Sequence, residues 1–259
     1  MTSNLECVGL GVDSSKSLGA LVRRALPASI TLGVANGVEV RRWEDSSGSR
    51  LILGMRDGDV VDLLPSFAGQ LGAKLGEVHA LNDTVNGADV LDESGEQVTS
   101  MNFELEENRF LRDLGSSPGG STVINALGLE ISVHANAEEF SLSPSSLLDG
   151  GESRSSEPPA VYVERGWDWP PRVGSESFIP TGQFGTPSAM GRLFGTVLSA
   201  GGKTCALSGG EFVVALVRTV GFIANLCTPF SEVSEIPIPG NIIGGTVYLV
   251  ASIPFLTMS

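Results

Sequence analysis

The sequence predicts a mainly β protein with a few short helices, the β-rich α+β class, on three observations. Two hairpin-type dipeptides, Asn36-Gly37 and Asp57-Gly58, separate β-branched and apolar runs between residues 29 and 64. From residue 191 onward, runs of the same kind follow one another to the end of the chain. Glycine is abundant, with 33 of 259 residues, and has no collagen period, which indicates many turns. We therefore expect an N-terminal antiparallel meander and a small C-terminal β-barrel of OB or SH3-like size.

The meander is the strongest of these patterns. Residues 29–43 read SITLGVANGVEVRRW, and residues 50–64 read RLILGMRDGDVVDLL. Asn-Gly and Asp-Gly favour a positive φ at both central turn residues, which type I′ hairpins require. We expect four antiparallel strands in chain order.

Two segments have clear helical patterns. Residues 16–26 read KSLGALVRRAL, and Pro27 ends this run. In residues 102–114, Asn102 is a plausible N-cap, glutamates occupy the early turns and arginines the late ones, and Gly115 follows. That order suits the helix dipole and a glycine C-cap, so we expect a helix in each segment.

The next segments differ in their periodicity. Residues 70–81 have apolar residues at helical spacing, although two glycines weaken this helix. Residues 121–135, STVINALGLEISVHA, predict a strand with a bend at its glycine. Residues 141–159 are rich in serine and proline and predict a loop, and residues 160–164, AVYVE, predict a short strand.

The C-terminal part predicts a closed or nearly closed barrel of four or five strands, with glycines at its bends. This divides the chain into three expected parts. They are an acidic β-meander-containing domain (1–143), an irregular Ser/Pro-rich crossing segment (144–190) and a small β-barrel domain (191–259).

Charge is distributed unevenly along this acidic chain. Residues 174–259 contain three basic and four acidic side chains, a net charge of −1, whereas the whole chain carries −14. Residues 1–173 therefore carry −13, which repels phosphate backbones. Nucleic-acid binding needs a clustered basic face, and none is visible in the sequence. We expect no nucleic-acid partner.

The termini give no membrane or secretion signal. Residues 236–259 have no charge, but prolines and glycines interrupt them, and TVYLVASI is β-branched. We expect a buried strand there and no membrane span. The first residues lack a basic region and a long apolar run, so we expect no signal peptide.

The chain contains three cysteines, Cys7, Cys205 and Cys227. Their odd number, wide spacing and lack of a CxxC motif argue against a disulfide scaffold and a zinc ribbon. Cys205 and Cys227 lie in apolar segments and could face each other. We expect buried thiols in a reducing compartment and a cytoplasmic location.

No catalytic motif survives inspection. GSSPG at residues 115–119 resembles a nucleophile elbow around Ser117, but Pro118 has no N–H to donate to an oxyanion. The glycines before Lys203 are at the wrong spacing for a phosphate loop. The two histidines, His79 and His134, lie far apart and lack metal-ligand spacing. We predict no catalytic residue, no metal site and no cofactor.

One aromatic segment remains, ERGWDWPPRVGSESF, from Glu164 to Phe178. Its indole rings and flanking arginines could hold a ligand or a peptide. They also suit a strap that plugs the gap between two β parts, which is the interpretation that we favour. If a ligand binds at this junction, the candidate residues are Trp167, Trp169, Arg165, Arg172, Glu164 and His134.

Three functions remain open. The first, which we favour, is a non-catalytic interaction or assembly protein of the bacterial cytosol type, with a homo-oligomeric or protein partner on the C-terminal barrel. Its support is the near absence of charge there, which suggests a covered surface. The second is a small-ligand-binding protein or enzyme with a site at the junction. The third is an OB-type oligonucleotide or saccharide binder, which would need exposed aromatic platforms.

Overall fold

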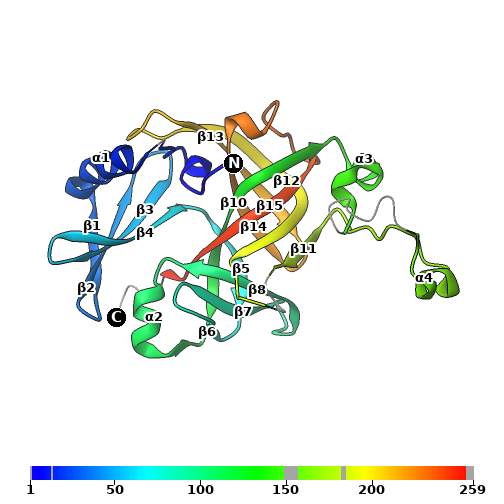
Figure 1. The fold of residues 1–259 in the computed structure, drawn as a ribbon, viewed down its shortest axis with the longest axis horizontal. Helices are drawn as coiled ribbons and strands as arrows, with labels where there is room; N and C mark the ends of the chain where they lie inside the picture. Colours follow the sequence, from blue (N-terminus) through cyan, green and yellow to red (C-terminus); the bar gives the residue numbers. More distant parts are fainter. Residues whose placement is uncertain (1, 13, 149–156, 182–184, 255–259) are drawn as a thin grey trace.

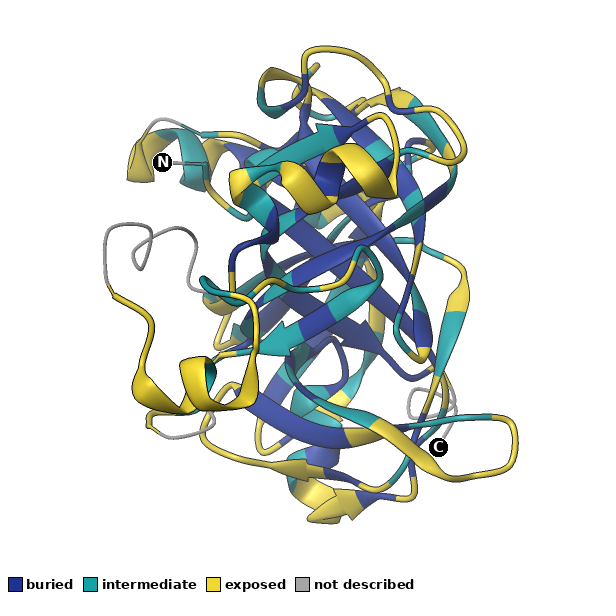
Figure 2. Ribbon diagram, turned by 90° about the vertical axis from the view of Figure 1, so that its right-hand side faces the viewer, coloured by how far each residue is buried: buried dark blue, intermediate teal, exposed yellow. Residues whose placement is uncertain are grey.

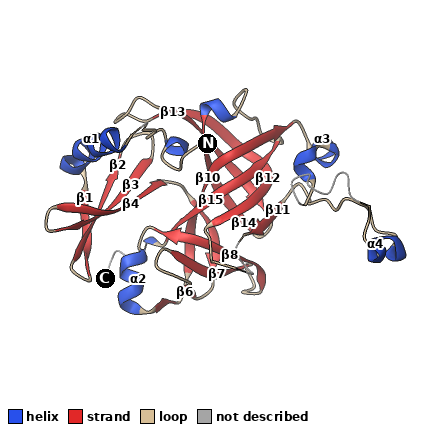
Figure 3. Cartoon of the chain, in the orientation of Figure 1, coloured by secondary structure: helices blue, strands red, loops and turns tan. Residues whose placement is uncertain are grey.

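The computed structural model describes residues 2–12, 14–148, 157–181 and 185–254. Its strands form two sheets, and its helices are short (Figures 1 and 3). The predicted mainly β class is therefore confirmed. The strands are β1 (Ile30–Ala35), β2 (Val38–Glu44), β3 (Ser49–Arg56), β4 (Asp59–Phe67), β5 (Leu71–Leu75), β6 (Val78–Ala80), β7 (Val85–Leu91), β8 (Gln97–Leu105), β9 (Ser116–Ser117), β10 (Gly120–His134), β11 (Ser177–Pro180), β12 (Met190–Thr204), β13 (Glu211–Thr219), β14 (Phe222–Pro229) and β15 (Ile242–Ser252). The α-helices are α1 (Ser15–Ala25), α2 (Asn108–Leu114), α3 (Ala137–Leu142) and α4 (Ala160–Arg165), and the 3-10 turns are η1 (Glu6–Val8), η2 (Leu26–Ala28), η3 (Pro144–Ser146) and η5 (Phe230–Glu232).

The predicted meander is confirmed as an antiparallel sheet in the order β1-β2-β3-β4. Its two hairpin turns have the expected geometry. Asn36 and Gly37 have φ of 52° and 71°, and Asp57 and Gly58 have φ of 54° and 89°. Both central residues of each turn are thus left-handed, as type I′ turns require.

The second sheet has 11 strands, and five of them close into a ring. Around the ring, β12 pairs with β13, β13 with β14, β14 with β10, β10 with β15, and β15 again with β12. β12 closes the ring because its first half pairs with β15 and its second half with β13. Gly195 lies in β12 near this change of partner, and a Cβ there would lie 2.2 Å from the carbonyl oxygen of Arg218.

One strand of the ring comes from the first of the three predicted parts, residues 1–143. β10 lies between β14 and β15, which belong to the predicted barrel domain, and it is parallel to β14. It fits the strand expected at residues 121–135, and its register shifts between Gly128 and Glu130. The predicted domain boundaries stay a prediction, but the first and third parts share one sheet.

The helix predicted at residues 102–114 begins later than expected, because its first residues belong to a strand. Residues 97–105 form β8, and only residues 108–114 of the expected helix are helical. In β8 the side chains of Met101, Phe103 and Leu105 alternate into the core, with exposures of 1, 0 and 1%. This period of two outweighed the helical arrangement of charges.

Residues 70–81 were also expected to be helical, and this is wrong. They form β5 and β6, which join the large sheet. At Gly72 a Cβ would lie 2.1 Å from the carbonyl oxygen of Ile223, so glycine permits a close approach of two backbones. Gly72 therefore serves the strand rather than weakens a helix.

The short strand expected at residues 160–164 is a helix, α4. No neighbouring strand lies beside it in Figure 1, and helix-ending contacts stabilise it instead. Gly166 has a left-handed φ of 63°, and the N–H of Trp167 donates to the carbonyl oxygen of Tyr162 at 2.9 Å. This is the bond of a Schellman C-cap. Part of the loop expected at residues 141–159 is η3, and residues 149–156 lie outside the described residues.

The ring is packed on both sides. One apolar cluster fills it and extends to β7 and β8, and a second joins its outer face to the four-stranded sheet, α1 and η1. In Figure 2 the strands of this body are mostly dark blue, which marks buried residues. Burial within the chain therefore accounts for the low charge of residues 191–259.

Candidate functional site

The aromatic segment does not clamp the two β parts together, and this corrects the interpretation favoured from the sequence. Its first part, residues 164–172, belongs to an arm, residues 157–172, whose helix α4 stands away from the body, at the end opposite the four-stranded sheet (Figure 1). Its last residue, Phe178 of β11, is buried in the apolar cluster that fills the ring. The side chain of Trp167 is 51% exposed. Among the described contacts, its ring meets Tyr162 edge-on at 5.5 Å between centroids, within the arm itself.

The tip of the arm is a small aromatic cluster. Tyr162 also contacts the ring of Trp169, at 4.9 Å between centroids, and Trp169 is half-buried. The guanidinium of Arg165 lies over the ring of Trp167 at 4.8 Å, a cation–π contact. Glu164 is exposed on α4. The arm thus brings together four of the six candidate residues, on a projecting element rather than at a junction.

The fifth candidate, Arg172, holds the root of the arm. Its Nη1 donates to the carbonyl oxygens of Ser141 and Ser143 at 2.8 and 2.9 Å, and to the hydroxyl of Ser146. A backbone bond from Leu148 N–H to Pro171 O, 2.8 Å long, lies beside it. Arg172 therefore ties the root of the arm to α3 and η3.

The sixth candidate, His134, belongs to the packing of α3 against the ring. It is 9% exposed, and its ring packs edge-on against Phe140 at 5.4 Å between centroids. Its Nε2 lies 3.1 Å from the hydroxyl of Ser132. Burial lowers the pKa of His134, and the charge of Glu139 opposes this. The described contacts of His134 are therefore with β10 and α3, and not with the aromatic cluster of the arm.

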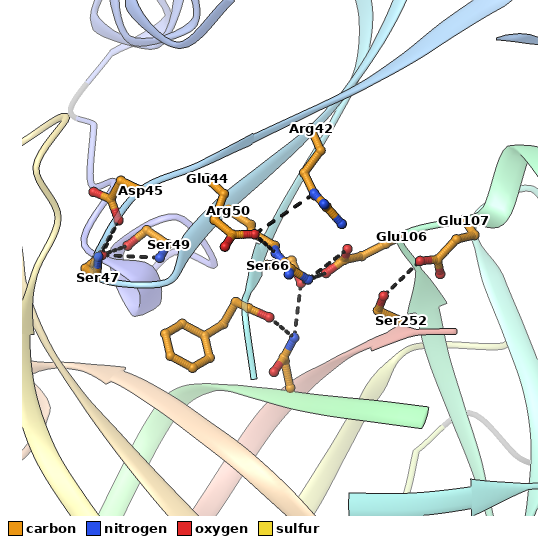
Figure 4. Close-up of polar contacts among 12 residues, drawn as sticks. Arg42, Glu44, Asp45, Ser47, Ser49, Arg50, Ser66, Glu106, Glu107 and Ser252 are labelled. Atoms are coloured by element: carbon orange, nitrogen blue, oxygen red, sulfur yellow. Dashed lines mark hydrogen bonds and ion pairs between the residues drawn. The ribbon is translucent and has the colours of Figure 1, made fainter. Parts of the chain in front are cut away.

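A different group of polar side chains lies where the four-stranded sheet meets the large sheet (Figure 4). Its centre is Glu106, 3% exposed, at the corner between β8 and α2. Arg50 of β3 places Nη1 3.4 Å from both of its carboxylate oxygens, and Ser66 of β4 donates its hydroxyl to Oε1. Glu106 thus binds two strands of the four-stranded sheet.

The group continues into the ring and to the surface. Asn125 of β10 donates through Nδ2 to the hydroxyl of Ser66 at 3.1 Å and to Phe67 O at 2.7 Å. On the other side, Arg50 Nε donates to Glu44 Oε2 at 2.6 Å. Burial lowers the pKa of Arg50, but the charges of Glu106 and Glu44 outweigh it and raise the pKa. Arg50 therefore stays protonated and links Glu106 to Glu44.

The neighbouring residue, Glu107, is 2% exposed and faces the end of β15. Its Oε1 accepts from the hydroxyl of Ser252 at 2.8 Å, and its Oε2 accepts from the N–H of Ile253 at 3.0 Å. Burial, together with the charge of Glu106, raises the pKa of Glu107 to about 7. We name Glu106, Glu107 and Arg50 the junction cluster.

A cavity of about 40 Å³ lies beside the junction cluster. Glu104 of β8 and Glu106 of the turn after it line this cavity, and Asp62 and Arg109, an ion pair at 3.2 Å, line it from β4 and α2. Burial and the charge of Asp62 raise the pKa of Glu104, and hydrogen bonds with Tyr248 and Thr84 oppose this. Small-molecule sites occupy about 300–1,000 Å³, so this cavity has room for water and not for a substrate.

One sequence pattern marks the position of the junction cluster, although the charge order of the same residues predicts a helix. In residues 101–107, MNFELEE, the apolar side chains alternate up to Leu105, and two glutamates follow. Alternation up to Leu105 places Glu106 and Glu107 at the end of a strand, where the chain turns inside the protein. Nothing in the sequence, however, places Arg50 or Ser252 beside them.

All three cysteines are free and buried, and they share one apolar cluster. Burial raises the pKa of Cys7 to about 12 and that of Cys227 well above its usual value. A thiol with a raised pKa has little thiolate and is a poor nucleophile. Within the described ranges, no group of three or more His, Cys, Asp or Glu side chains is arranged to hold a metal, and no helix has the length and apolarity to cross a membrane.

Comparison of the chain with known protein families, with curated proteins and with solved structures finds no match.

Proposed function

We propose that this protein is a non-catalytic interaction or assembly protein, and that the arm is its contact element. The observation that carries the proposal is that large apolar side chains are exposed on an ordered projecting helix. Val161, Val163 and Trp167 of the arm are 42, 66 and 51% exposed. Exposed apolar groups that gather on one element are typical of a surface that binds a protein.

Exposed apolar side chains also occur near the root of the arm. Leu142 and Leu148 are 76 and 45% exposed, so five of the fifteen large exposed apolar side chains among the described residues lie between residues 142 and 167. Arg172 fixes the arm to α3 and η3 through three bonds, which favours a preorganised contact element. Aromatic and arginine side chains, as at Tyr162, Arg165 and Trp167, are enriched at interface hot spots.

The arm is a better contact element than the predicted surface on the C-terminal strands. That expectation was based on their low charge, which burial within the chain explains. A homo-oligomer or another protein as partner agrees with the arm equally well. For the cellular location we keep the cytoplasm, since three buried free thiols suit a reducing compartment.

Site-specific photo-crosslinking in cells tests the proposal. A photoreactive residue is placed at Val163 of the arm or, as the matched control, at Val61 of β4, which is 49% exposed on the body. We expect crosslinked species, to a second copy or to another protein, from position 163 at several times the yield from position 61. Equal yields from the two positions would overturn the proposal.

A small-ligand or enzyme site at the junction is the second candidate. Its support is the group of buried glutamates with raised pKa beside a cavity, an arrangement that acid–base catalysis uses. The size of the cavity disfavours it. Replacing Glu104 with Gln distinguishes this candidate from the interaction protein. Only a site that uses the carboxylate of Glu104 requires the change to reduce the activity of the protein in the intact cell without lowering its stability.

An OB-type oligonucleotide or saccharide binder is the least supported candidate. The ring of five strands would then be the small barrel expected from the sequence. Residues 192–220 contain two aromatic side chains, Phe194 and Phe212, which are 1 and 0% exposed and cannot stack with bases or sugars. The chain charge of −14 disfavours a polyanion as well.

A further inference from the structure

We propose that Glu106 and Glu107 form a latch that holds a proton, joins the four-stranded sheet to the end of β15, and weakens when the proton is lost. This device is separate from the arm and does not depend on the function proposed for it. The two residues are consecutive in the turn between β8 and α2, and their side chains contact different elements. Glu106 faces β3 and β4, and Glu107 faces β15.

The two carboxylates differ in how their charge is compensated. Glu106 lies 3.4 Å from the guanidinium of Arg50 and accepts a hydroxyl bond from Ser66. Glu107 accepts bonds from one hydroxyl and one backbone N–H, of Ser252 and Ile253, and these partners carry no charge. A buried carboxylate without a cation costs much more than a paired one, so the proton resides on Glu107.

Both protonation states of Glu107 can be hydrogen-bonded. The ionised form accepts from the hydroxyl of Ser252, whose oxygen lies 2.8 Å away. In the neutral form, the carboxylic acid can donate to the same oxygen, since a hydroxyl both donates and accepts. The joint therefore survives protonation, and what changes is the charge buried beside Glu106.

The charged groups around the latch do not remove this effect. Burial raises the pKa of Glu106 as well, and the charges of Arg50 and Arg42 oppose this, so the guanidinium of Arg50 that is bonded to Glu106 is already engaged. Arg50 is shared further with Glu44. The ionisable groups that face the latch or its cavity are Arg42 and Glu44 from β2, Arg50 from β3, Asp62 from β4, Glu104 from β8, Arg109 from α2 and Tyr248 from β15.

The direction of the pH effect follows from the raised pKa of Glu107, about 7 against an ordinary value of 4.5. Between these values the folded protein keeps a proton that the unfolded chain releases. Stability from this group is therefore complete below pH 4.5 and is lost as the pH rises to about 7. Most carboxylates act in the opposite direction, because their pKa falls on folding.

The test compares the full-length protein with E107Q by denaturant unfolding from pH 5 to 8. The amide of Gln is neutral at every pH, so the ratio of the wild-type to the E107Q unfolding constant isolates the latch from the overall charge of the chain. We expect this ratio to rise about tenfold or more over the range. The matched control is E93Q, at an exposed glutamate in the β7–β8 turn, for which the ratio stays flat.

A ratio for E107Q that stays within about twofold over the range overturns the proposal. If E107Q does not fold, the carboxyl carbon of Glu107 is titrated by NMR in the wild-type protein. A midpoint above about 6 supports the latch, and a midpoint of about 6 or lower overturns it.

Discussion

The junction cluster and the arm are opposites in what they bury. The junction places two carboxylates and a guanidinium inside the protein, with Glu106 and Glu107 at 3 and 2% exposure. The arm places an indole and two valines outside it, with Trp167 at 51% exposure. Both arrangements reverse the usual preference of these side chains, and each requires its own explanation. We therefore expect changes at the junction to alter the stability of the fold, and changes at the tip of the arm to alter contacts with other molecules while leaving stability almost unchanged.

The largest expected effect is at the junction. Replacing Arg50 with Ala leaves Glu106 buried without its cation, and we expect the free energy of unfolding at pH 7 to fall by about 3–5 kcal/mol. Denaturant unfolding measures it, with R24A on the exposed face of α1 as the control, expected within about 0.5 kcal/mol of wild type. A loss below about 1 kcal/mol for R50A would mean that the cluster does not support the joint.

A smaller loss is expected from Ser66, which both donates to Glu106 and accepts from Asn125. Replacing it with Ala leaves two buried polar groups with one partner fewer, so we expect a loss of about 1–3 kcal/mol. The matched control is S94A, which removes an exposed hydroxyl bonded to Asp92. Similar losses of stability in S66A and S94A would show that the buried hydrogen bonds of Ser66 contribute no more than an exposed one.

At the root of the arm, we expect a substitution to loosen the arm while lowering the free energy of unfolding only slightly. Replacing Arg172 with Ala removes the bonds to Ser141, Ser143 and Ser146, and we expect a loss of about 1 kcal/mol. Limited trypsin digestion should cleave after Arg165 several times faster than in the wild-type protein. An unchanged cleavage rate would contradict the idea that Arg172 fixes the arm.

The smallest effect is expected at the tip. Replacing Trp167 with Ala should change the free energy of unfolding by less than about 0.5 kcal/mol, because half of the side chain already faces solvent. Replacing the buried indole of Trp43, which is 4% exposed, should cost about 3–5 kcal/mol and serves as the comparison. If the two substitutions lower the free energy of unfolding equally, Trp167 is a buried anchor between the two β parts and not an exposed contact residue.

The sequence predicted those parts of the fold in which local residues decide the structure. Asn36-Gly37 and Asp57-Gly58 determine two turns and with them the four-stranded sheet. The ring was predicted only in part, because β10 is distant in sequence from the strands that it joins. Pairing across such a distance leaves no local pattern.

The candidate site shows the same limit. Trp167 and Trp169 were found from their spacing to Pro170 and Pro171, but their exposure depends on how α4 leaves the body. Whether an indole plugs a gap or projects from the surface is a property of the tertiary structure. The sequence places Glu107 in the early turns of a helix. Its contact with Ser252 of β15 could not be predicted, because 145 residues separate the two.

The most direct test of whether the arm is the contact element is to replace residues 158–168 with a Gly/Ser linker of equal length. This change removes α4 and Trp167 and leaves Arg172 in place. We expect the free energy of unfolding to stay within about 1 kcal/mol of wild type, and the crosslinked or assembled species seen with the intact arm to disappear. A loss of several kcal/mol, or an unchanged assembly, would contradict the assignment of the arm as the contact element.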